Sequence, residues 1–264
     1  MFRKYYIGLI ILFLFTSCAN IQFKFDKLEE NDSEKSDDNA VKTEDAIKET
    51  RISTIPRSKG DSDALNWDIG SLDTARSIKY LSEVEKDVIL EMNKVRTDPK
   101  KFAELYIKPL LKYYRGNKFI EGNSMPILTQ EGISAVEECY AVLKKSVSSG
   151  ILFPEKGLSL AALDHVKDQN VSGATGHSGK DGSSPLSRTQ RYGRGMKIGE
   201  NIAYGPYSGR KIVSELLIDD GVPSRGHREN ILRQDFSQTG VSIGNHKKYR
   251  IVCVIVYAKD YVSK

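Results

Sequence analysis

The chain has 264 residues, of which 39% are hydrophobic and 28% are charged, values typical of a soluble globular protein. Its three cysteines are too few for a disulfide-stapled mini-fold or a multi-cysteine zinc ribbon, and its single long apolar run excludes a multi-span membrane protein. The formal net charge of +5 is not concentrated in a Lys/Arg stripe, so we expect no nucleic-acid partner.

The N-terminus has the pattern of a secretory signal peptide. Two basic residues precede an apolar run over residues 5–15, which is too short to span a membrane comfortably. The small residues before Cys18 resemble a bacterial lipobox, so we expect residues 1–17 to be removed and Cys18 to become the lipidated first residue. Two or more acyl chains, such as palmitate, would hold the protein firmly on a membrane. A plain signal peptide with an incidental cysteine is the alternative.

A polar segment over residues 18–76 follows the signal peptide. Within it, residues 26–50 contain ten acidic residues against four lysines. Such a segment cannot bury enough apolar surface to offset its ordering entropy, so we predict a disordered acidic tether. Leu65 and Trp67 near its end could dock on the body and mark where order begins.

The body, predicted over residues 77–264, opens with helices. Apolar residues repeat at spacings of three and four after each of four candidate N-caps: Ser82, Asp98, Thr129 and Ser159. Pro99 suits the first position of the second helix, and Pro109 should end or bend that helix.

The last third of the chain predicts strands. Residues 239–243 and 249–258 are rich in β-branched residues and are joined by a polar hairpin connection. The second run is apolar on both faces, so it needs a layer of structure above and below it. We therefore predict an α+β fold with a sheet between helices. Cys139 and Cys253 are expected to be buried free thiols, with a disulfide between them as the alternative.

A glycine-rich region with two histidines precedes these strands. Thirteen of the 21 glycines lie between Gly173 and Gly244, and loops of this kind often carry site residues. Three clusters stand out there: GHSGKDGSSPLSR at 176–188, IGENIAYG at 198–205 and SELLIDDGVPSRGHRENIL at 214–232. In this order they resemble the bacterial branch of the CAP superfamily, or SCP domain, which includes cysteine-rich secretory proteins, antigen 5 and pathogenesis-related proteins of group 1. The resemblance covers roughly residues 82–258 and implies a three-layer α-β-α sandwich.

The resemblance also implies a central cleft with two histidines and two acidic residues. We assign these four positions, in chain order, to His177, Glu200, Asp219 and His227. Asp219 is preferred for the second acid, with Asp220 and Glu215 as alternatives, since Leu216 or Leu217 stands where many members have a tryptophan shortly before this acid. Near the cleft, Asp181 and Arg188 are expected to pin the histidine loop. Asn201 is expected to satisfy buried backbone groups, and Arg228 and Asn230 to brace a short turn.

Two imidazoles could bind a divalent cation such as Zn²⁺, with His177 and His227 as the ligands. The carboxylates would add a ligand or orient the rings. Two protein ligands make a weak, open site, so we expect no obligatory cofactor. Without metal, a carboxylate beside each ring would make the pair pH-sensitive. A purely structural polar latch is the simpler alternative.

These features favour a non-enzymatic binding module, anchored through Cys18 and displayed on the outer membrane or cell surface. Its relatives imply a lipid or sterol, or a host or envelope protein, as the partner. The alternative is a metal-dependent or Ser/His-type hydrolase, such as a protease, that uses His177, Glu200 and His227 with a serine among residues 178–184. No G-x-S-x-G nucleophile elbow supports that alternative. A structural scaffold of the cell envelope is a third hypothesis.

Overall fold

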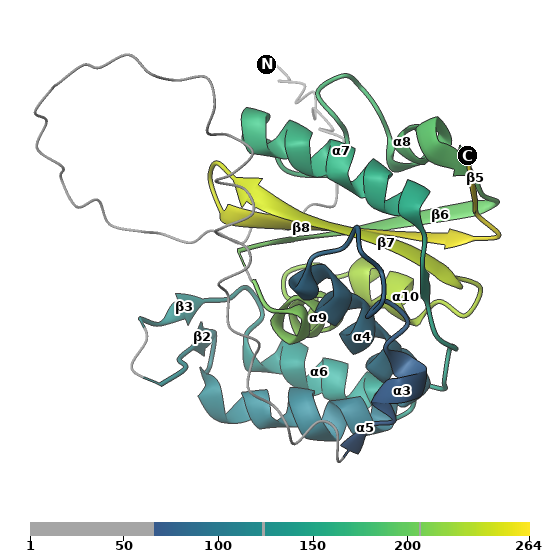
Figure 1. The fold of residues 1–264 in the computed structure, drawn as a ribbon. Coiled ribbons are helices and arrows are strands. Elements are labelled where there is room, and N and C mark those ends of the chain that lie inside the picture. The colour runs from purple at the N-terminus through teal and green to yellow at the C-terminus, as the bar shows by residue number, and fades with distance from the viewer. Residues whose placement is uncertain (1–65, 123–124, 206) are drawn as a thin grey trace, which may run out of the picture.

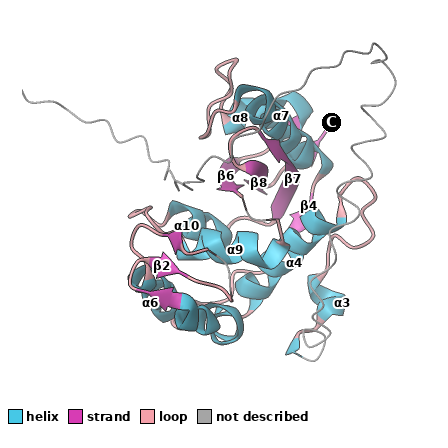
Figure 2. Cartoon of the chain, turned by 90° about the vertical axis from the view of Figure 1, so that its left-hand side faces the viewer, coloured by secondary structure: helices cyan, strands magenta, loops and turns pink. Residues whose placement is uncertain are grey.

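The computed structural model describes residues 66–264 except 123–124 and 206. The predicted signal peptide, Cys18, Leu65 and most of the predicted tether lie outside these residues. Figure 1 shows a sheet between two helical layers, and the view at 90° in Figure 2 shows the same arrangement. The α+β prediction with helices on both faces of a sheet is therefore confirmed.

The central sheet has the strand order β4-β7-β8-β6. Its strands are β4 (Phe153–Pro154), β6 (Lys197–Tyr204), β7 (Gln238–His246) and β8 (Arg250–Lys259). Strand β8 pairs antiparallel with both β7 and β6, whereas β4 runs parallel to β7. Two peripheral sheets contain β1 (Tyr114–Arg115), β2 (Lys118–Phe119) and β3 (Ile127–Leu128), and β5 (Gly193–Arg194) and β9 (Val262–Ser263).

One face of the sheet carries α7 (Lys156–Ser172) and α8 (Pro185–Tyr192). The larger helical layer lies on the other face. It contains α3 (Ile69–Leu72), α4 (Glu83–Thr97), α5 (Pro99–Phe102), the π-helical η1 (Ala103–Ile107), the 3-10 segment η2 (Lys108–Tyr113), α6 (Ile133–Leu143), α9 (Gly209–Ile218) and α10 (Gly226–Leu232). The predicted bend at Pro109 falls within η2, where the α-helical hydrogen-bond pattern has already ended.

Strand β8 is buried on both faces, as its sequence predicts. Successive side chains of a strand point to opposite faces. Val252, Val254 and Val256 accordingly pack with the α7 side of the sheet. Cys253 and Ile255 pack into the larger core between the sheet and the opposite helices. The alternation of the apolar side chains thus gives each helical layer its own core.

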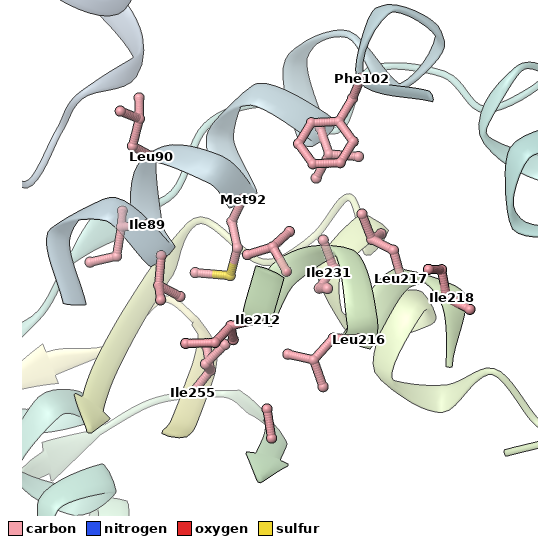
Figure 3. Packing of buried hydrophobic residues seen from close by; sticks show 14 of the residues in the cluster. Ile89, Leu90, Met92, Phe102, Ile212, Leu216, Leu217, Ile218, Ile231 and Ile255 are labelled. Carbon is pink, nitrogen blue, oxygen red and sulfur yellow. The ribbon is translucent and has the colours of Figure 1, made fainter. Parts of the chain in front are cut away.

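The larger core joins α4 and α9 to the sheet. Figure 3 shows Ile89 and Met92 of α4 close to Ile212 and Leu216 of α9, with Ile255 of β8 beside them. Ile89, Met92 and Ile212 are fully buried. This packing fixes α9, and α9 presents several residues of the site described below.

Two of the four predicted N-caps are confirmed. The Ser82 side chain accepts a hydrogen bond from the amide of Glu85, whose carboxylate accepts the Ser82 amide in return, a capping box at the start of α4. Asp98 accepts a hydrogen bond from the Lys101 amide and caps α5, with Pro99 at the first helical position.

The other two predicted N-caps are wrong. Helix α6 begins at Ile133 after Gly132, whose φ of 68° suits glycine, and Thr129 instead bonds the carbonyl of Asn117. Helix α7 begins at Lys156, three residues before Ser159. In both cases a polar residue near the helix start fits the N-cap pattern, but another residue, Gly132 or Glu155, occupies the N-cap position.

The packed body includes residues before 77, the position at which we predicted it to begin. Trp67 is buried, donates a hydrogen bond of 2.9 Å to the Tyr106 hydroxyl and stacks on its ring. Residues 66–76, which we assigned to the tether, therefore belong to the body, and the expected docking of Trp67 is confirmed. Across the described part of the chain, each helix is too short or too polar to cross a bilayer. Cys139 and Cys253 are buried free thiols, as predicted.

Candidate functional site

The first histidine lies on the loop between α7 and α8. The loop is tied down on both sides of Gly176, whose carbonyl lies 2.7 Å from His165 Nε2 and whose amide donates to the Tyr204 hydroxyl. Gly176 has a φ of 95°, a conformation that favours glycine. This local geometry carries His177 to the edge strand β6, with its side chain 38% exposed.

Glu200 on β6 orients the His177 ring. His177 Nδ1 lies 2.9 Å from one carboxylate oxygen, and Arg188 of α8 donates to the other at 2.7 Å. The Glu200 and Arg188 side chains are only 1% and 2% exposed. Arg188 also donates to the carbonyls of His177 and Ser183, which pins the histidine loop as predicted. Its acidic partner is Glu200, however, and Asp181 pairs with Arg191 at the surface.

The second histidine begins α10 and is held in the same way. His227 Nδ1 lies 2.6 Å from one oxygen of Asp219, and the His227 amide donates to the other oxygen at 3.0 Å. Asp219 ends α9 in the left-handed conformation with a φ of 56°, which aspartate tolerates better than most residues. The Asp219 side chain is 2% exposed and that of His227 is 22% exposed.

Two asparagines join these halves. Asn201, next to Glu200, donates from its side chain to the His227 carbonyl, as its predicted backbone role requires. Asn230 donates to the Asn201 side-chain oxygen at 2.9 Å and braces the turn of α10 against β6. The G-E-N and G-H-R-x-N clusters are therefore connected directly by hydrogen bonds.

Both imidazoles line one small cavity of about 80 Å³. Asp219 lies in its wall as well, together with Tyr204 and Glu215. An ionised carboxylate can only accept, so in a neutral ring the proton lies on Nδ1 and Nε2 is the acceptor. Neither Nε2 has a hydrogen-bond partner among the residues that the structure describes.

The alternative acids have different partners. Asp220 accepts the backbone amides of residues 130–132 at 2.6, 2.7 and 3.0 Å and so fastens the turn before α6. Glu215 faces two cavities, and its carboxylate has no hydrogen-bond partner among the described residues. Arg228 donates to Glu138 and does not enter the cleft. Sequence reasoning missed the exposure of Glu215 to a second cavity, because no local pattern reveals what packs beside a helix.

A divalent metal fits this cavity only as a weakly held ion. Each ring is oriented by a buried carboxylate, which is the usual outer-shell arrangement of zinc-ligating histidines. The described residues contain no cluster of three or more His, Cys, Asp or Glu side chains that could hold an ion. His177 and His227 would therefore be the protein ligands, and water would complete the coordination.

Residues 152–257 match the family model of the CAP, or cysteine-rich secretory protein, family. These residues form a CAP domain. The match includes His177, Glu200, Asp219 and His227. It begins at residue 152, whereas the resemblance that we noted in the sequence begins at about residue 82. Helices α4, α5 and α6 lie outside the match but share the core of the CAP domain.

Three solved structures have partial similarity to the chain. An outer surface protein of Borrelia burgdorferi is 18% identical, with a TM-score of 0.34, over 41% of this chain and 77% of that one. An extracellular protein of Bacillus anthracis that contains an SCP domain is 19% identical, with a TM-score of 0.36, over 48% and 38%. A cysteine-rich secretory protein of Staphylococcus aureus is 14% identical, with a TM-score of 0.32, over 48% and 38%. No curated protein matches the chain.

Proposed function

We propose that the chain is a lipid-anchored binding module of the bacterial cell envelope whose CAP domain binds a divalent cation between two histidines. Lipidation of Cys18 and display on the outer surface are inferred from the N-terminal sequence alone. A lipid, sterol or protein partner is a further expectation from the family resemblance.

The observation that supports the cation site is the matching environment of the two histidine rings. His177 and His227 come from separate segments, yet a buried carboxylate engages Nδ1 of each ring, and both rings line the same cavity. Because each ring is already held in place through Nδ1, it would lose little further conformational freedom when its unbonded Nε2 binds a metal ion. A merely structural latch has no need to leave both Nε2 atoms unbonded.

A serine hydrolase has no comparable support. The predicted nucleophile candidates, Ser178, Ser183 and Ser184, are absent from the lining of the histidine cavity. The Ser183 hydroxyl lies near Arg188 instead. A metal-bound water would be the nucleophile of a metal-dependent hydrolase, and the variants below test that alternative too.

The test is calorimetric titration of the full chain with Zn²⁺ at pH 7.5. The wild-type protein is expected to bind one Zn²⁺ ion per chain more weakly than a structural zinc site does, and the double variant H177A/H227A is expected to lose at least about tenfold in affinity. The variant E229Q changes an exposed carboxylate two residues from His227 and should bind Zn²⁺ as the wild-type protein does.

Circular dichroism and thermal unfolding would establish that the double variant is folded. Equal Zn²⁺ affinity of the folded double variant and the wild-type protein would contradict the cation site. If the zinc-loaded wild-type protein hydrolyses peptides and the double variant does not, the protein is a metal-dependent hydrolase rather than a binding module.

A further inference from the structure

A second and larger cavity lies beside α9. Its volume is about 400 Å³, five times that of the histidine cavity. Apolar and aromatic side chains from η1, η2 and the strands β1 to β3 form much of its wall, notably Tyr106, Leu110, Tyr114, Phe119 and Ile127. Cavities of this size and character hold small organic molecules.

One face of α9 supplies the opposite wall. Lys211, Ser214, Glu215 and Ile218 line the cavity and lie three or four residues apart, which places them on one side of the helix. Glu215 also lines the histidine cavity, so its carboxylate stands between the two hollows. No side chain or backbone group of the described residues forms a hydrogen bond with that carboxylate.

The other charged groups of this cavity are engaged or lie at its exposed rim. Arg210 bonds Glu91 at 3.1 Å and covers the Tyr106 ring at 4.0 Å from its centroid. Asp220 already accepts three backbone amides. Lys211 and Glu121 are exposed to solvent. Glu215 is therefore the acid of the cavity interior whose carboxylate has no hydrogen-bond partner among the described residues, and the charge that acts on it is that of Lys211, one helical turn before it.

A carboxylate in this position favours one kind of ligand. Removing a carboxylate from water without pairing it is costly, and burial accordingly raises the pKa of Glu215 to about 7. A positive charge beside Glu215 would remove that cost. The rings of Tyr114 and Phe119, whose centroids lie 5.1 Å apart, line the same cavity, and aromatic faces attract cations.

An anionic ligand is less well matched. It would face Glu215, and the Arg210 guanidinium is already paired with Glu91, so the remaining cation of the lining is Lys211, which is exposed to solvent. A neutral amphiphile would fill the apolar wall but would leave Glu215 unpaired once ionised. The cavity thus combines an apolar wall, aromatic rings and one unpaired acid.

We infer that this cavity binds an organic cation, an ammonium ion with an apolar body, whose charged nitrogen lies against Glu215. The apolar body occupies the space between Tyr114, Phe119 and Ile218. This site is distinct from the proposed Zn²⁺ site, since the histidines do not line the larger cavity, and either site can exist without the other.

The test compares three probes of equal chain length by calorimetry with the full chain at pH 8 and low salt, each below its micellar concentration. The probes are octyltrimethylammonium, octyl sulfate and octyl glucoside. The cation is expected to bind one molecule per chain, at least about tenfold tighter than the other two. In E215Q the preference for the cation is expected to disappear while the affinity for octyl glucoside is unchanged.

The matched control is E121Q, which removes an exposed carboxylate of the same cavity and should keep the preference for the cation. A second variant, F119L, retains apolar volume but removes a ring, and it is expected to weaken binding of the cation about threefold or more without weakening octyl glucoside. Equal binding of the three probes to the wild-type protein, as in adventitious detergent partitioning, would overturn the inference. An undiminished preference in folded E215Q would overturn it as well.

Discussion

Two glutamates near the cleft meet opposite electrostatic conditions. Glu200 is buried but receives a hydrogen bond from Arg188 and another from His177, so its charge is compensated on both oxygens. Glu215 is half-buried between two cavities without a hydrogen-bond partner for its carboxylate, and burial raises its pKa to about 7. The first arrangement supports a fixed site, whereas the second leaves a charge that a ligand can satisfy.

At the residue scale, the titration of Glu215 should make folding pH-dependent. Because the pKa of Glu215 is higher in the folded protein than in the unfolded chain, the unfolded chain releases this proton first as the pH rises. Stability that is present below about pH 4.5 is then lost up to about pH 7. The substitution E215Q removes this loss, so its advantage over the wild-type protein should be larger at pH 8 than at pH 5 by about 1–3 kcal/mol.

Urea unfolding at both pH values measures this difference. The charged and titratable groups around Glu215 are Arg210, Lys211, Asp219 and Asp220 on or beside α9, Tyr106, Tyr114 and Glu121 at the larger cavity, and His177, Tyr204, His227 and Tyr249 at the smaller one. They are present in both proteins, so their own titration largely cancels in the comparison. An E215Q effect of equal size at pH 5 and pH 8 would contradict the account of an unpaired acid.

At the element scale, close contact between α7 and β7 holds the helical layer formed by α7 and α8 to the sheet. Gly240 of β7 faces the first turn of α7, where a Cβ atom would overlap the backbone of Leu158 and Ser159. The backbone of a helix and that of a strand approach each other here without an intervening side chain. The loop that carries His177 follows directly from α7, so the position of the site depends on this contact.

The substitution G240A is expected to destabilise the protein by about 3 kcal/mol or more, because neither backbone can yield without repacking the layer. The matched control is G70A in α3, where the nearest atom to the added Cβ would be the Asp68 carboxylate at an ordinary 3.5 Å. That change should cost less than about 1 kcal/mol. Chemical denaturation of the two variants measures both effects, and equal stability of G240A and the wild-type protein would refute the close contact.

At the scale of the whole molecule, Arg96 connects α4 with the loops that lead into the sheet. It is fully buried and donates five hydrogen bonds to backbone carbonyls, those of Ser149, Gly150, Ile231, Arg233 and Phe236. Burial lowers the pKa of Arg96 to about 10, which leaves the side chain charged at neutral pH. Segments up to 140 positions apart in the sequence are thereby held by one guanidinium.

The substitution R96K is expected to cost about 2–5 kcal/mol of unfolding free energy. A lysine has three donors and a different shape, so at least two of the five buried carbonyls would lose their partner. The control R115K changes an exposed arginine that bonds only the nearby carbonyls of Lys112 and Tyr114, and it should cost less than about 0.5 kcal/mol. Thermal unfolding of R96K and R115K measures the loss of stability in each variant. A loss in R96K no larger than that in R115K would show that Arg96 does not connect the layers.

Much of the fold could be predicted because its signals are local. The capping box at Ser82, the Asp98 cap and the two-faced apolar pattern of β8 each depend on residues within a few positions of one another. The order of three short motifs likewise indicated the CAP domain and brought His177, Glu200 and His227 into one hypothesis. The role of these residues in binding stays a prediction.

The partners within the site depend on tertiary packing. The choice of Asp219 beside His227, the pairing of Glu200 with Arg188 and the engagement of Asp220 by residues 130–132 follow from how α9, β6 and α6 meet. The amino-acid sequence determined the local elements, because helix and strand periods are short-range properties, and its resemblance to the CAP superfamily indicated which chemical groups lie in the cleft region. Only the tertiary structure decided which carboxylate is paired and which one faces an open cavity, because burial and pairing depend on residues distant in sequence.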